Sequence, residues 1–139
     1  MKKFCLIMFA AFLLLAGCSK NDGGSSSNTT NQLKGMWSGP EFEVPAYMYA
    51  TSLSRSCVYD FINNNTVISY GTVDKFQHDY ETNKEPLPGH NGWYYLDVNK
   101  KTLTYAFEDN KVIMTNGVIL TYMDGQLYLD NSSTVLSRW

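Results

Sequence analysis

The sequence has few of the residues that build covalent or metal-bonded frameworks. Only three cysteines and two histidines occur in the chain. Cys5 lies in an apolar N-terminal run and Cys18 closes it, so Cys57 is the single cysteine of the remaining chain, which cannot form a disulfide framework of its own. His78 and His90 lack the compact ligand spacing of a zinc site. We therefore expect no metal and no cofactor.

Positive charge is also scarce. Lys and Arg number 11 against 13 Asp and Glu. Removal of Lys2 and Lys3 with a leader leaves nine basic residues against the same 13 acidic ones, which is a net charge of −4. Proteins that bind nucleic acid gather Lys and Arg on one face. The composition therefore excludes a nucleic-acid partner and a polybasic membrane patch.

A long apolar span is missing as well. The apolar run at residues 4–15 is shorter than the about 20 residues of a transmembrane helix. Two lysines precede this run, and the small residues Ala16 and Gly17 end it. This is the pattern of a cleaved export signal.

The sequence Leu15-Ala16-Gly17-Cys18 resembles the lipobox of bacterial lipoproteins. The resemblance implies that residues 1–17 are a cleaved signal peptide and that Cys18 carries a diacylglyceryl group, with acyl chains such as palmitate. It also implies an outer-membrane protein, lipid-anchored on the periplasmic or the cell-surface face. The alternative is an ordinary secretory signal with a chance cysteine. Residues 18–34 are polar and rich in Gly and Ser, so we expect a lipidated cysteine followed by a flexible tether.

From Gly35 to the end at Trp139, short β-branched and aromatic runs alternate with turn residues, which predicts an all-β domain over residues 35–139. Asn116-Gly117 and Asp124-Gly125 are strong two-residue hairpin signals. We expect hairpins that join 57–62 to 66–70 and 92–97 to 102–107, strands at 111–115, 118–123, 126–129 and 134–138, and further strands at 36–38 and 46–51.

Short connections favour an antiparallel meander, and about eight such strands remove their free edges by closing into a small β-barrel. Residues 73–91, which contain Pro86 and Pro88, form the longest expected loop.

Gly35-Met36-Trp37 and Arg138 resemble the signature of the lipocalin and wider calycin families. In that pattern the Trp closes the narrow end of the barrel and the Arg lies over it. The resemblance implies a lipocalin-like barrel in which Gly35, Trp37 and Arg138 are structural residues. The chain departs from the pattern because it has no Thr-Asp-Tyr in its later loops and no C-terminal helix after the last strand.

No motif supports an enzyme. Cys57 with a histidine base has no local signature. The carboxylate pairs Glu41 with Glu43 and Glu108 with Asp109 read as solvated turns or strand edges. For Cys57 we expect a buried small hydrophobe, with a reactive thiol or an intermolecular disulfide as the alternative.

Aromatic residues are abundant, with 10 Tyr, 7 Phe and 3 Trp. Most are expected in the core. Tyr80, Trp93 and Tyr95 can offer apolar faces to a ligand, and His90 can offer a polar group, at the open end of the barrel.

Two functions follow from these expectations. The first is a small apolar or glycan ligand bound in the barrel cup. The alternative is a structural or interaction lipoprotein with a filled barrel that binds an envelope protein partner through the long loop.

Overall fold

The computed structural model describes residues 32–45, 51–75 and 84–139. In these residues, eleven strands form one antiparallel sheet. The elements are β1 (Gly35–Ser38), β2 (Glu41–Pro45), β3 (Thr51–Phe61), β4 (Thr66–Asp74), β5 (Lys84–Pro86), β6 (Tyr94–Leu96), the 3-10 helix η2 (Asp97–Asn99), β7 (Lys101–Glu108), β8 (Lys111–Met114), β9 (Ile119–Met123), β10 (Gln126–Leu129) and β11 (Val135–Arg138).

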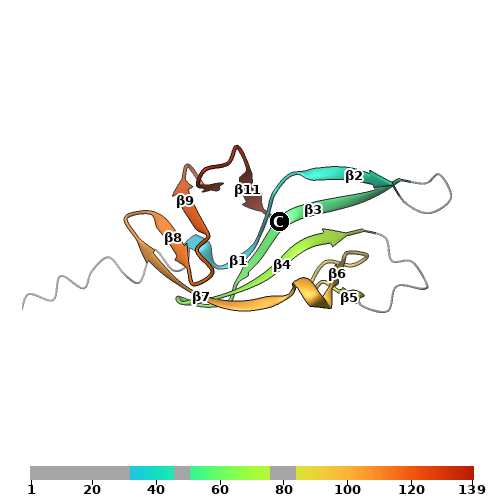
Figure 1. Cartoon of the computed structure of the whole chain (residues 1–139), viewed down its shortest axis with the longest axis horizontal. Helices are drawn as coiled ribbons and strands as arrows, with labels where there is room; N and C mark the ends of the chain where they lie inside the picture. Colours follow the sequence, from blue (N-terminus) through green and yellow to red (C-terminus); the bar gives the residue numbers. More distant parts are fainter. Residues whose placement is uncertain (1–31, 46–50, 76–83) are drawn as a thin grey trace, which may run out of the picture.

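Eight of these strands close into a barrel, as the sequence predicts. Around the ring, β1 pairs with β3, β3 with β4, β4 with β7, and then β7 to β11 pair in chain order. β11 pairs back onto β1 and closes the ring (Figure 1). The fold is therefore a closed antiparallel β-barrel with up-and-down strand order.

Tight turns set this order locally. Asp109 and Asn110 between β7 and β8 have φ of 50° and 61°, and Asp124 and Gly125 between β9 and β10 have φ of 53° and 78°. Positive φ at both central residues matches the right-handed twist of the flanking strands. Asp109 thus lies in an exposed turn, as expected for the Glu108 and Asp109 pair.

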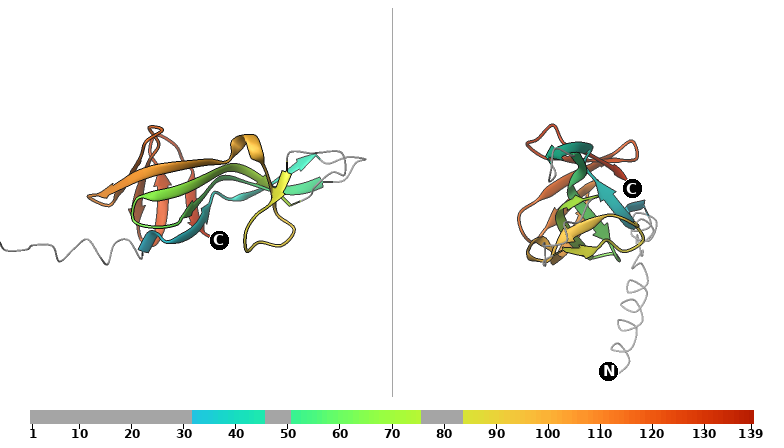
Figure 2. Two further views of the ribbon diagram at one scale, coloured as in Figure 1. Left: turned by 90° about the horizontal axis from the view of Figure 1, so that it is seen from below. Right: turned by 90° about the vertical axis from the view of Figure 1, so that its right-hand side faces the viewer.

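Three strands lie outside the ring. β3 and β4 run on past the barrel, where β2 pairs with β3 and β6 pairs with β4, and β5 adds to β6. The result is an open sheet in the order β2-β3-β4-β6-β5, which projects from one end of the barrel (Figure 2). The barrel and this projecting sheet therefore share two continuous strands.

The expected hairpin between residues 92–97 and 102–107 is wrong. β6 and β7 do not pair with each other, because both pair with the same edge of β4. β7 faces residues Thr66 to Ser69, and β6 faces Val73 and Asp74. The nine residues of β4 are long enough for both partners, and η2 carries the chain from one to the other.

The long loop expected at residues 73–91 is corrected in part. Val73 and Asp74 end β4, and Lys84–Pro86 form β5. Residues 76–83 lie outside the described residues, as do residues 46–50 of the strand expected at 46–51. Strand β2 was not expected, because its proline and two glutamates indicate a loop. As an edge strand it tolerates them.

An irregularity at Cys57 changes which side chains face the barrel. Cys57 has φ of 51°, and the register of β3 against β4 shifts between Arg55 and Val58. Gly71, opposite Val58, has φ of 71°. Such a bulge inserts a residue and turns the strand. Cys57 is half-buried and contacts the barrel core, so it is not the fully buried residue that we expected.

Two hydrophobic clusters result. The interior cluster packs inside the barrel with Leu33, Trp37, Tyr59, Phe61, Val67, Tyr105, Val112, Met114, Leu120, Leu127 and Leu136. The outer cluster packs on the opposite face of β1, β3 and β4 with Met36, Val58, Tyr70, Val73, Leu87, Trp93 and Tyr95. Leu33 is fully buried, so the folded domain includes part of the tether expected over residues 18–34.

Tyr59 in the interior cluster makes stability sensitive to high pH. Burial, and after it the nearby Cys57, raises the pKa of the Tyr59 phenol to about 12 from 10.0. The unfolded chain then loses this proton first, so stability is full below pH 10 and falls as pH rises toward 12. We expect the ionisation of Tyr59 to lower the free energy of unfolding by about 2–3 kcal/mol across that window.

Urea unfolding at pH 8 and at pH 11 measures the effect in wild type and in Tyr59→Phe. The variant should lose less stability than wild type between the two pH values. Equal losses would show that Tyr59 does not carry the alkaline sensitivity. Tyr70 and Tyr105, whose pKa values burial also raises, should leave a residual slope in both proteins.

Candidate functional site

The contact between Trp37 and Arg138 that was expected from the sequence is present where β1 pairs with β11. Trp37 is fully buried, and the Arg138 guanidinium carbon lies 4.7 Å from its ring centroid. The Trp37 indole N–H donates to the Leu33 carbonyl at 2.7 Å. Arg138 donates to the backbone carbonyls of Lys34, at 2.7 Å, and of Gln32. These contacts tie the chain before β1 to the last strand.

The backbone conformation at position 35 favours glycine. Its φ is 109°, a conformation that side chains disfavour, and a Cβ there would lie 3.5 Å from the Arg138 guanidinium. Gly35, Trp37 and Arg138 are thus brought together as structural residues.

Large side chains occupy the barrel interior. Phe61 and Tyr105 meet edge to face with ring centroids 5.1 Å apart, and Trp37 meets Tyr122 in the same way at 6.2 Å. The Tyr105 hydroxyl donates to the Asn63 carbonyl at 2.7 Å. A small eight-stranded barrel is compatible with a lipocalin-like cup. In this one, rings from neighbouring strands pack against one another inside.

The residues expected to bind a ligand lie elsewhere. Trp93 and Tyr95 belong to the outer cluster and are 8% and 2% exposed, so they face the outer wall of the barrel instead of its interior. The His90 ring lies against Trp139 in a tilted arrangement, with centroids 4.3 Å apart. Tyr80 and Cys18 lie outside the described residues. Ligand binding by Trp93, Tyr95 and His90 stays a prediction.

Arg55 connects the outer cluster to the surface. Its guanidinium carbon lies 4.8 Å from the Trp139 ring centroid and 5.6 Å from that of Trp93. The two indoles meet edge to face at 4.8 Å. Burial, and then the charge of Arg55, lowers the pKa of His90. Arg55 is therefore the cation of this aromatic group.

A group of polar side chains surrounds the Tyr95 hydroxyl. This hydroxyl donates to Glu85 at 2.5 Å and accepts from Lys100 Nζ at 3.1 Å. The hydrogen bond from Tyr95, and after it one with Asp97, lowers the pKa of Glu85. Loss of solvation, and then Glu85, raises the pKa of Asp97. The group joins β5, β6 and η2, and this position gives it a structural role.

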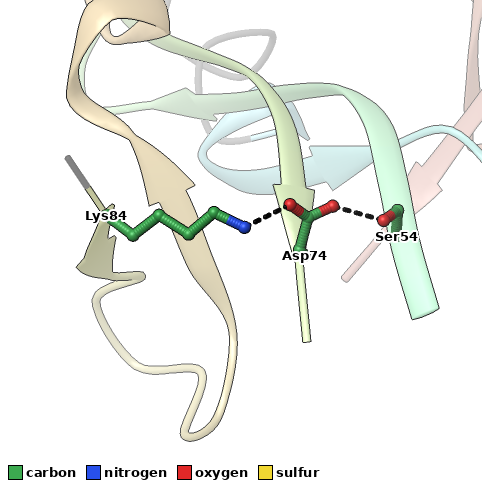
Figure 3. Close-up of polar contacts among 3 residues, drawn as sticks. All are labelled: Ser54, Asp74 and Lys84. Atoms are coloured by element: carbon green, nitrogen blue, oxygen red, sulfur yellow. Dashed lines mark hydrogen bonds and ion pairs between the residues drawn. The ribbon is translucent and has the colours of Figure 1, made fainter. Parts of the chain in front are cut away.

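Another group of polar side chains joins the strands of the projecting sheet. Asp74 on β4 accepts from the buried Ser54 hydroxyl on β3 and pairs with Lys84 Nζ on β5 at 2.7 Å (Figure 3). The Lys84 side chain is only 6% exposed. Ser54 and Lys84 lie on either side of the Asp74 carboxylate, so the group links β3, β4 and β5.

The outer wall carries a cleft of about 560 Å³. It lies between β11 with the turn before it and the start of β2, next to Arg55. Its lining residues are Ser38, Gly39, Pro40, Glu41, Arg55, Ser133, Thr134, Val135 and Ser137.

Sequence reasoning did not single out this cleft. Arg55 is the only arginine besides Arg138 in the chain, and this scarcity is the one signal that could have marked it. Its neighbours in space come from β1, β2 and the turn before β11, and no local pattern joins these segments.

Within the described ranges, no three His, Cys, Asp or Glu side chains gather where a metal ion could be held. No helix among these residues has the length and apolar character to cross a membrane.

Comparison with known proteins finds no matching family model, no similar curated protein and no similar solved structure.

Proposed function

We propose that this chain is a non-enzymatic, lipid-anchored protein of the outer-membrane envelope that binds its partner on the outer surface of a filled barrel. The observation that carries this proposal is the interior cluster, in which eleven buried side chains pack together inside the ring. An eight-stranded barrel has room either for its own side chains or for one small ligand. The packing of these side chains against one another inside the ring supports the filled scaffold over a ligand held in the cup.

The lipid anchor in this proposal rests on Leu15-Ala16-Gly17-Cys18, which resembles a lipobox. A single acyl chain anchors a protein only marginally, whereas two or more acyl chains give stable attachment. A diacylglyceryl group on Cys18 supplies two chains. The acidic remainder of the sequence adds no electrostatic attraction to anionic lipid.

Membrane fractionation of Cys18→Ala tests the anchor. We expect wild type to sediment with the envelope and Cys18→Ala to appear in the soluble fraction, with loss of labelling by a palmitate analogue. Cys57→Ala is the matched control, because it removes a cysteine that lies outside the lipobox, and it should behave as wild type. Sedimentation of Cys18→Ala with envelopes would refute the anchor.

Titration with a fluorescent fatty acid tests the filled barrel. We expect no saturable binding to the full-length protein and no change in Trp37 emission. Saturable binding that Met114→Trp weakens would instead support a ligand inside the cup, because Met114 belongs to the interior cluster. The two experiments are independent, so the anchor and the filled barrel can fail separately.

A further inference from the structure

The cleft next to Arg55 has the size and form of a small-molecule site. Its volume of about 560 Å³ lies within the usual range for such sites, about 300–1,000 Å³. It is on the outer wall because Ser38 and Ser137, which face each other across β1 and β11, alternate with the inward-facing Trp37 and Leu136. A ligand bound there does not need to enter the barrel.

The lining side chains balance donors and acceptors. Ser38, Ser133, Thr134 and Ser137 supply hydroxyl groups, which both donate and accept hydrogen bonds. Arg55 is the one cation in the lining and Glu41 the one anion, so the lining has no net charge. Neither an anion nor a metal cation is favoured by such a surface, whereas a neutral ligand with many hydroxyl groups matches it.

Arg55 is held in place before any ligand arrives. The rings of Trp139 and Trp93 lie against its guanidinium, and its Nη1 donates to Ser38 Oγ at 2.9 Å. A cation on an aromatic face is attracted to the ring and loses orientational freedom. The fold has therefore already restricted this long side chain, so little of its conformational entropy remains to be lost on binding.

Arg55 also has donors to spare. Its Nη2 lies 3.6 Å from Glu41 Oε2, which is an ion pair but longer than a hydrogen bond. Nη2 donates no hydrogen bond to any residue that the structure describes, and the Arg55 side chain is 25% exposed. Glu41 is 38% exposed and keeps free acceptor positions.

We propose that this cleft, floored by Ser38 and Ser137 and flanked by Arg55 and Glu41, binds a neutral saccharide. Arg55 Nη2 donates to one sugar hydroxyl, and Glu41 accepts from a neighbouring one. Pro40 and Val135 offer apolar contact to the carbon face of the sugar ring. The inference goes beyond the proposed function, because it depends on the cleft and not on the lipid anchor.

The test is a titration of the full chain in detergent with the neutral trisaccharides maltotriose, cellotriose and chitotriose, followed by tryptophan emission. Trp139 and Trp93 contact Arg55, so a sugar in the cleft should change their fluorescence. We expect saturable binding of at least one trisaccharide. Loss of a hydrogen bond to a charged group costs about ten- to a hundredfold in affinity, so Glu41→Ala should weaken binding by that factor.

Glu43→Ala is the matched control, since it removes the same charge from the same strand at an exposed position that does not line the cleft. Its affinity should equal that of wild type. Ser133→Phe, in the exposed turn, should block the cleft without touching either hydrophobic cluster.

Three results would overturn the proposal. They are no saturable change with any of the three sugars up to about 10 mM, equal weakening by Glu41→Ala and Glu43→Ala, and binding of only the charged probes glucuronate and inorganic phosphate. Each result leaves the membrane fractionation of Cys18→Ala unaffected, so the two proposals are distinguished.

Discussion

Trp37→Ala is expected to lower the free energy of unfolding by about 3–5 kcal/mol, the usual cost of removing a buried tryptophan. Trp37 is fully buried, Arg138 lies over its ring, and the ring of Tyr122 meets it in an edge-to-face arrangement. The substitution opens a cavity and removes the aromatic face on which Arg138 rests. Urea denaturation followed by far-ultraviolet circular dichroism measures the loss.

Trp37→Phe is the control for this experiment. It keeps an aromatic ring but removes the hydrogen bond to the Leu33 carbonyl, so we expect a loss that is smaller than for alanine, yet more than the about 1 kcal/mol of one hydrogen bond. A free energy within about 1 kcal/mol of wild type for Trp37→Ala would contradict the role of this residue in closing the barrel.

Asp74→Ala is expected to lower the free energy of unfolding by about 2–3 kcal/mol. It removes the carboxylate that pairs with the amine of Lys84, whose side chain is only 6% exposed. The Ser54 hydroxyl, which is fully buried, loses its acceptor as well. The cost is below that of a fully buried pair because the Asp74 side chain is 26% exposed and solvent can enter.

The double variant Asp74→Leu with Lys84→Met separates the loss of the pair from the loss of packing. Replacement of a buried ion pair by apolar side chains is often neutral, so the double variant should recover most of the stability that Asp74→Ala loses. Chemical denaturation of the variants gives the comparison. A double variant less stable than Asp74→Ala would show that the pair itself stabilises the projecting sheet.

The local features of the fold were predictable because neighbouring residues decide them. Asn116-Gly117 and Asp124-Gly125 marked the turns after β8 and β9, and the structure has both turns there. Left-handed backbone is accessible to few residue types, so these turns can be recognised without the rest of the chain. The strand at Gly35–Ser38 was likewise predictable from the local sequence.

Other features depended on contacts between distant residues. The pairing of β6 and β7 with one edge of β4 was missed because the sequence between them looks like a hairpin turn. The bulge at Cys57 was missed because no residue type requires it, although it allows Arg55 and Val58 to lie on one face. Leu33 was assigned to the tether because it stands alone among polar residues.

The sequence by itself determined the all-β class, the closed meander and the Trp37 and Arg138 pair, because alternation, turn chemistry and one signature specify them residue by residue. Tertiary structure alone decided what occupies the barrel interior and where a site can lie. The face on which Trp93 and Tyr95 pack follows from strand pairing and from the bulge at Cys57. The cleft next to Arg55 exists only because three segments that are remote in sequence meet when the ring closes.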